Sequence, residues 1–184
     1  VFTGGADDDV LQNLEGGFIA MVEFDGDEGA DELFNLGVIT ELVFTGGADD
    51  DVLQNLDAGL IDVLSFGGDE GADELFNFGE ITELMFTGGA DDDVLLNLDG
   101  GLIDQLQFGG DEGADELFNL GDITELVFTG GADDDVLQNL HGGQVDTLDF
   151  IGDGGEDLLV NRGTVLDLTF TGGADDDILL NLGE

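Results

Sequence analysis

The chain has 184 residues, of which 46 are Asp or Glu and only one is Lys or Arg, so its formal net charge at pH 7 is -45. This charge excludes a nucleic-acid partner, because phosphate binding needs clustered Lys or Arg, and it disfavours an anionic membrane surface. The chain also has no Cys and no apolar run long enough for a transmembrane helix, which excludes disulfides, thiol chemistry and membrane insertion.

Nine phenylalanines set the frame of an internal repeat, because the steps between them alternate strictly between 22 and 20 residues. Seven residues after each of them comes an Asp, followed by a Leu two positions further on and an Asn two positions beyond that. A fixed period of about 20 residues is typical of a solenoid, in which each turn packs against its neighbours. The nine residues are Phe2, Phe24, Phe44, Phe66, Phe86, Phe108, Phe128, Phe150 and Phe170.

The elements of one turn follow a constant order, which the first unit illustrates. A glycine-rich turn at residues 4–8 leads into Asp-x-Leu-x-Asn at residues 9–13. A Gly-x-Ile segment at residues 17–19 then precedes Val-x-Phe at residues 22–24. The second and fourth of these segments alternate with period two and contain strand formers, and no turn has room for a helical periodicity.

The sequence therefore predicts an all-β fold, a parallel β-helix (β-solenoid) of about nine turns with alternating 22 and 20 residues. We expect residues 1–184 to form one repeat array that is a segment of a longer array, because the chain begins and ends within a repeat. Hydrophobic residues make up 41% of the chain, and they would form ladders of Leu, Ile, Val and Phe inside the rod. With rungs about 4.8 Å apart, nine rungs give a rod roughly 40 Å long.

Three further features have structural interpretations. The repeated Asn predicts a ladder of side-chain amides that bond to one another along the axis, in preference to a row of polar ligands. His141 lies in a two-residue loop where other units carry Glu15, Asp57 or Asp99, and Arg162 replaces a Leu or Phe. We expect neither His141 nor Arg162 to act as a metal ligand or catalyst.

The aspartates of the glycine-rich turn are the candidate metal ligands. One Asp recurs in every turn while its neighbours vary, and a second row of Asp lies in the same turns at less regular positions. The invariant row, the primary ligand candidate, comprises Asp9, Asp31, Asp51, Asp73, Asp93, Asp115, Asp135, Asp157 and Asp177. The secondary row comprises Asp7, Asp27, Asp49, Asp69, Asp91, Asp111, Asp133, Asp153 and Asp175.

These turns resemble the calcium-binding nonapeptide G-G-x-G-x-D-x-U-x of the RTX (repeats-in-toxin) proteins. The stretch "GDEGADELF" from Gly26 departs from it only at Asp27, and "GGADDDVLQ" from Gly4 departs only at Asp7. The resemblance recurs once per turn, whereas RTX proteins use two nonapeptides per turn and bind calcium along both edges. It therefore implies a calcium row along one edge only. The whole frame also looks like β-helical repeats of bacterial autotransporters and large adhesins.

Electrostatics independently favours Ca²⁺ as the cofactor. Stacked carboxylates about 5 Å apart repel one another by roughly 0.9 kcal/mol in water and by more in a protein, and the chain has almost no cation of its own. Calcium accepts six to eight oxygens in forgiving geometry, whereas Mg²⁺ demands a tight octahedron, and zinc or copper would need His or Cys. We expect about one Ca²⁺ between adjacent turns. The alternative is that the acids only form a solvated face.

The uniform repeat favours a structural protein over an enzyme, because a catalytic site needs one special place in the chain. The first hypothesis is a calcium-stabilised rod of an adhesin, extracellular fibre or surface layer, secreted or on the bacterial cell surface. The alternative is a calcium-folded RTX secretion module attached to an enzyme or toxin outside this segment. Polysaccharide cleavage and ice binding are weaker alternatives.

Other copies of the same chain are the expected partners. Neither end has a polar cap, so we expect continuation through further repeats or end-to-end stacking. Phe34, Phe76 and Phe118 recur every 42 residues and point away from the core if the Leu and Asn of their strands point inward. We expect this apolar stripe to pack laterally against another rod or a neighbouring domain, unless the flanking Glu side chains shield it.

Overall fold

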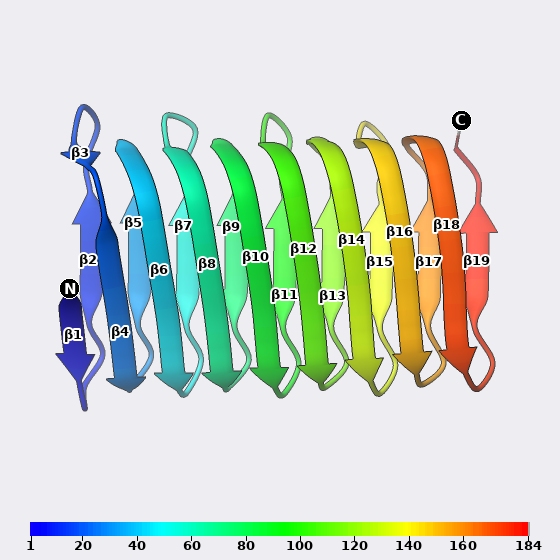
Figure 1. Cartoon of the computed structure of the whole chain (residues 1–184), viewed down its shortest axis with the longest axis horizontal. Coiled ribbons are helices and arrows are strands. Elements are labelled where there is room, and N and C mark those ends of the chain that lie inside the picture. Colours follow the sequence, from blue (N-terminus) through cyan, green and yellow to red (C-terminus); the bar gives the residue numbers. More distant parts are fainter. Residues whose placement is uncertain (184) are drawn as a thin grey trace.

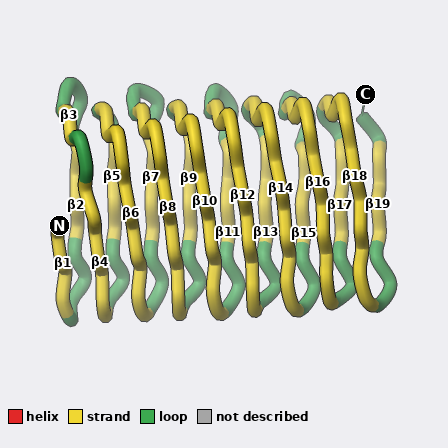
Figure 2. Tube along the Cα trace, in the orientation of Figure 1, coloured by secondary structure: helices red, strands yellow, loops and turns green. Residues whose placement is uncertain are grey.

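The computed structural model describes residues 1–183 and confirms a parallel β-solenoid of about nine turns. Each turn, or rung, contains one long and one short strand, and the rungs stack along a straight axis (Figure 1). Strands and connecting loops account for the trace of residues 1–183 in Figure 2. Within residues 1–183 there is no helix of the length and hydrophobicity needed to cross a membrane.

Two sheets form the walls of the solenoid, and we call them the long sheet and the short sheet. In Figure 1 the long strands run in one direction in front, and the short strands return behind them. The long sheet contains β1 (Phe2–Gly5), β3 (Phe18–Ile19), β4 (Val22–Glu28), β6 (Val38–Ala48), β8 (Leu60–Glu70), β10 (Glu80–Ala90), β12 (Leu102–Glu112), β14 (Asp122–Ala132), β16 (Gln144–Gly154) and β18 (Thr164–Ala174). The short sheet contains β2 (Val10–Asn13), β5 (Glu32–Asn35), β7 (Val52–Asn55), β9 (Glu74–Asn77), β11 (Val94–Asn97), β13 (Glu116–Asn119), β15 (Val136–Asn139), β17 (Leu158–Asn161) and β19 (Ile178–Asn181).

The register of both sheets matches the sequence repeat residue for residue. Where β10 pairs with β8, Ile81 aligns with Ile61, Leu84 with Leu64 and Phe86 with Phe66. In the short sheet the same rule aligns Leu with Leu and Asn with Asn on every rung. A slip of one residue would turn every buried side chain outward, so the period of the sequence fixes the register.

The core is a set of ladders along the axis, as the sequence predicts. The nine phenylalanines form one continuous stack with ring centroids 4.8–5.1 Å apart and planes within 14° of parallel. The phenylalanines of the seven inner rungs are fully buried, together with their neighbouring Leu, Ile and Val ladders. Each ring therefore gains contact area from the rungs on both sides.

The Asn ladder is confirmed as a structural feature. The side-chain Nδ2 of each Asn donates to Oδ1 of the Asn on the next rung at 2.8–2.9 Å, from Asn13 through to Asn181. The inner members are buried, and this chain satisfies polar atoms that would otherwise be costly inside a core.

The alternation of 22 and 20 residues has a simple structural origin. The longer rungs carry an extra two-residue turn between the short strand and the next long strand, at residues 15–16, 57–58, 99–100 and 141–142. Figure 1 shows the resulting loops protruding on alternate rungs. The insertions leave both sheets undisturbed because they lie wholly outside the paired segments.

Replacing Phe86 by Ala should test the ladder. Its ring is buried and stacks at 4.9 Å on both Phe66 and Phe108, so we expect a loss of about 3–5 kcal/mol in the free energy of unfolding. Met85 is 53% exposed, so Met85→Ala should change stability by no more than about 0.5 kcal/mol. Denaturant titration of both variants measures the difference. Equal effects would contradict a core formed by the stack.

Candidate cation-binding turn

The glycine-rich turn connects the end of each long strand to the following short strand. In the rung that begins at Phe44, this turn carries three consecutive aspartates, Asp49, Asp50 and Asp51. The structure gives the three side chains different environments. The first two are exposed, whereas the third is completely buried.

The invariant row lies inside the wall of the solenoid. Asp, Leu and Asn of each short segment point inward together, since side chains alternate along a strand, and the seven inner aspartates are at most 1% exposed. The backbone N–H of each Asp donates to Oδ1 of the Asp on the next rung at 2.6–3.1 Å. The structure thus brings the nine primary candidates together in one continuous line.

The second oxygen of each buried carboxylate in this row has no hydrogen-bond partner within the described part of the chain, residues 1–183. This holds for Oδ2 of Asp31, Asp51, Asp73, Asp93, Asp115, Asp135 and Asp157. An unpaired buried oxygen of this kind is costly, and more so when it is charged. Seven such atoms in one line therefore require a compensating proton or cation.

A glycine two residues after each core Phe faces this oxygen. At Gly68, an added Cβ would overlap Oδ2 of Asp73 and approach the carbonyl oxygen of Gly88 on the next rung. The same pair of atoms, a carboxylate oxygen and the glycine carbonyl of the following rung, surrounds Gly26, Gly88 and Gly110. The glycine thus leaves a small space into which two oxygens from adjacent rungs point.

Burial raises the pKa of the seven inner aspartates of the row. Removal from water is the largest cause, the charges of neighbouring aspartates add to it, and the backbone hydrogen bond to Oδ1 opposes it. The pKa rises to about 7 for Asp51, Asp93 and Asp135, to about 8 for Asp73 and to about 6 for Asp115. Burial also raises the pKa of Asp31 and Asp157. The fold alone therefore supplies no counter-charge to these carboxylates.

The donor set of this turn fits a hard cation. The two polar atoms nearest Gly68 are both oxygens, one from a carboxylate and one from a backbone carbonyl, and these are the ligands that calcium takes. No group of three or more His, Cys, Asp or Glu side chains lies close enough together in residues 1–183 to hold a metal by side chains alone. A cation in this turn would therefore need backbone carbonyls to complete its ligands.

The secondary row lies on the outside of the turn, where it has a conformational role. Eight of its nine members, all except Asp7, have a positive φ of 70–78°, and their side chains are exposed. From the second rung to the ninth, each turn has two left-handed positions, one taken by Asp and the other by Gly, and the two residues exchange places on successive rungs. Asp tolerates this region better than most residues, which explains why the departures from the nonapeptide are aspartates.

The exchange between Gly and Asp also has a packing reason. Gly47 has a φ of 114° and lies over the backbone carbonyl of Asp27 on the preceding rung, where an added Cβ would overlap it. Gly71 lies in the same way over Asp49. Asp therefore cannot occupy the same left-handed position on two successive rungs. The true repeat is the 42-residue unit of two rungs, rather than the single turn.

Sequence reasoning missed the role of the middle aspartate. Oδ1 of Asp50 accepts a hydrogen bond from the backbone N–H of Ala72 at 3.0 Å, and Asp92 does the same for Ala114 at 2.9 Å. Asp8 and Asp134 make the equivalent bond to the turn of the next rung. The signal in the sequence was that this Asp occurs only on alternate rungs, and that Ala or Glu holds the same place one rung after each of the first four.

The remaining residues singled out in the sequence lie away from this turn. His141 is exposed in the loop of the seventh rung, and Arg162 is exposed at the end of β17. Phe34, Phe76 and Phe118 are half-buried on the outer face of the short sheet, so they are less exposed than an isolated stripe would be.

No protein-family model matches the chain, and comparisons with curated proteins and with solved structures also return no match. The fold and the geometry of the turn are therefore the basis for any functional conclusion.

Two adjacent glycines provide a matched test of the space beside the row. Gly68→Ala should lower the free energy of unfolding by about 1–3 kcal/mol, as overpacking does, because the new methyl group would overlap Oδ2 of Asp73. An added Cβ at Gly67 meets no atom within 4 Å, so Gly67→Ala should leave stability within about 0.5 kcal/mol. Denaturant titration of both variants gives the comparison. Equal stabilities would show that the space is not tight.

The raised pKa values predict how the cation-free chain responds to pH. A folded-state pKa of about 6–8 lies above the ordinary value of 3.8, so protonation favours the fold. This contribution is complete below pH 3.8, decreases progressively as the pH rises above that value, and is fully lost once the pH has passed the folded-state pKa of about 6–8. In chelator, the free energy of unfolding should therefore fall between pH 6 and pH 8.

The aspartates whose pKa rises to about 6–8 all belong to the buried row, so we expect the slope to come from them. Replacing Asp51, Asp73, Asp93, Asp115 and Asp135 by Asn should flatten it, and replacing five exposed acids should not. A slope that survives in the Asn variant would contradict the assignment.

Proposed function

We propose that this chain is a calcium-stabilised structural rod of a secreted or cell-surface bacterial protein, such as an adhesin, an extracellular fibre or a surface layer. The observation that carries the proposal is the line of seven buried carboxylate oxygens without a partner. A rod that repeats one charged turn on every rung gains rigidity from its ligand, because each ion would join two consecutive rungs.

The residues for holding the ions are those of the invariant row and the glycines beside it. Asp73, for example, would contribute Oδ2, and Gly88 would contribute its carbonyl oxygen from the next rung. Bound calcium would supply the positive charge that the chain lacks. The backbone N–H bonds to Oδ1 hold each carboxylate in place before any ion arrives, so the turn is already arranged for binding.

The resemblance to RTX nonapeptides supports the same conclusion, because it falls on the turn in which the oxygens converge. Calcium linked in this way to the fold would keep the chain loosely structured where calcium is scarce and rigid outside the cell. A ligand that binds only the folded state stabilises it by about 2.7 kcal/mol per site at 100 times its dissociation constant. Several sites along one rod would turn a marginal fold into a persistent one.

A calcium titration of the wild-type chain and of Asp93→Asn tests the proposal. At pH 8 we expect the wild-type chain to gain β-structure in circular dichroism as calcium reaches millimolar levels, and calorimetry to show several bound ions. Asp93→Asn keeps an Oδ1 acceptor for Asp73 N–H but removes a buried charge. It should therefore be more stable than wild type in chelator and should gain less stability from calcium.

Asp104→Asn is the matched control, because Asp104 is exposed on the outer face of the long sheet. It should respond to calcium as the wild type does. Absence of calcium binding at millimolar concentration, or an unchanged calcium response in Asp93→Asn, would refute the proposal.

A further inference from the structure

The outer face of the short sheet differs from the rest of this acidic rod. Its outward side chains form three columns along the axis, of which the first lies beside the Asp turn and the third beside the protruding loops. The first column is Val10, Glu32, Val52, Glu74, Val94, Glu116, Val136, Leu158 and Ile178; the second is Gln12, Phe34, Gln54, Phe76, Leu96, Phe118, Gln138, Val160 and Leu180. The third is Leu14, Leu36, Leu56, Phe78, Leu98, Leu120, Leu140, Arg162 and Leu182.

Most of these positions are apolar, and three Glu are the only acids among them. In the inner rungs nearly all these side chains are half-buried. Each one is covered by its neighbours in the same column, and its outward surface remains exposed to solvent. The third column is an almost unbroken ladder of Leu and Phe, which a stripe of Phe34, Phe76 and Phe118 alone does not reveal. We call these three columns the apolar face.

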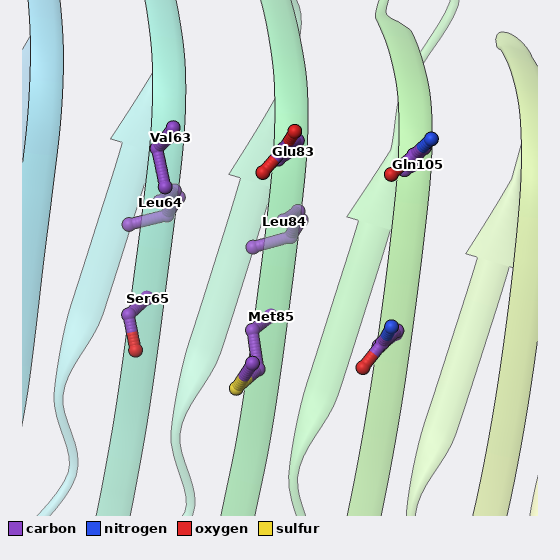
Figure 3. Close-up of a pocket in the computed structure, with 8 residues that line it drawn as sticks. Val63, Leu64, Ser65, Glu83, Leu84, Met85 and Gln105 are labelled. Atoms are coloured by element: carbon purple, nitrogen blue, oxygen red, sulfur yellow. The ribbon is translucent and has the colours of Figure 1, made fainter.

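The outer face of the long sheet has a mixed character. Figure 3 shows Val63, Ser65, Glu83, Met85 and Gln105 together on β8, β10 and β12, around a shallow hollow of about 140 Å³. In the column of Val43, Met85 and Val127, Ser65 and Gln107 separate the apolar side chains. The apolar face has a longer run of apolar residues and fewer acids.

We propose that the apolar face binds the apolar face of a second copy of this chain, with the two rod axes parallel. The length of the face is that of nine rungs about 4.8 Å apart, and its width is that of four residues along a strand, at about 3.3 Å per residue. The face therefore covers roughly 500–600 Å² on each copy. Two such faces bury roughly 1,100 Å², which is above the approximately 1,000 Å² threshold for a biological interface and in the range of weak association, below the roughly 1,200–2,000 Å² of a stable complex. Sheets pack face to face in this way at about 10 Å.

Charge decides between the two symmetric arrangements. If the axes are antiparallel, the first column meets its own copy, so both Asp turns lie on the same side and Glu74 approaches Glu116 of the partner subunit. If the axes are parallel, the first column meets the third, and each Asp turn lies beside the partner's loops, which carry fewer acids. Like charges across an interface are unfavourable, so the parallel arrangement is preferred. In both arrangements the central second column meets its own copy, but only the parallel one brings each residue of that column opposite the same residue of the partner.

The apolar face is defined by the register of the short sheet, so association through it does not require a bound cation. Sedimentation in 150 mM salt and millimolar calcium measures association, and circular dichroism on the same samples reports folding, so a failure of calcium binding is distinguishable from a failure of association. We expect wild type to sediment as a dimer at tens of micromolar. Phe34→Thr/Phe76→Thr/Phe118→Thr should fold and sediment as a monomer.

The matched control is Val63→Thr/Met85→Thr/Val127→Thr, which removes three exposed apolar side chains from the long sheet and should remain dimeric. If the Phe variant does not fold, Gln54→Glu/Gln138→Glu gives the same test, because it adds a charge to the second column without removing apolar area. Its dimer should dissociate at least tenfold more readily.

Thiol cross-linking tests whether the two rod axes are parallel. The wild-type chain lacks cysteine, so only the introduced cysteines can react. In the parallel dimer, Gln54→Cys faces the same position of its partner and should cross-link through a bis-maleimide spanning about 10 Å, whereas Ser65→Cys on the long sheet should not. A wild-type monomer at 100 µM would overturn the proposal and leave the face to a different chain. A dimer that survives the substitutions in the second column, or that does not cross-link through Gln54→Cys, would also overturn it.

Discussion

One constraint governs the rest of this structure: each rung places a carboxylate inside the wall, next to the carboxylates of the rungs above and below. Desolvation and mutual repulsion raise the pKa of Asp73 to about 8, so these groups ionise only at a cost to the fold. Their Oδ1 atoms accept backbone hydrogen bonds, but their Oδ2 atoms have no hydrogen-bond partner among residues 1–183. Stability therefore depends on what neutralises the row, a proton or a bound cation.

The composition of the turn follows from this arrangement. The glycine facing each carboxylate has no space for a side chain, and the two left-handed positions accept only one Asp because the other lies over the backbone of the preceding rung. The middle Asp ties the turn to the next rung. Three consecutive aspartates thus have three physical roles, and a charge-only account of "GGADDD" would treat them as equivalent.

The two sheets give the rod chemically different sides. Both contribute inward ladders of the same kind, yet the short sheet carries a mostly apolar outer face, whereas the long sheet carries a mixed one. The Asp turns lie on one edge and the protruding loops on the opposite edge (Figure 1). A rod with distinct edges and faces can bind ions along one side and other molecules along another without the two interfering.

The sequence by itself determined the fold class, the length of each turn, the register and the membership of the Phe, Leu and Asn ladders, because a side-chain period of two and a repeat of alternating 22 and 20 residues permit only one stacking. It also singled out the invariant Asp row. Only the tertiary structure decided that Asp51 and its counterparts are buried while Asp49 and Asp50 are exposed, and that Gly68 leaves space for Oδ2 of Asp73. Likewise, only the stacked rungs show that Leu56 and Phe76 belong to one apolar face. These properties arise between rungs, where residues about 20 positions apart meet, and a single turn does not contain them.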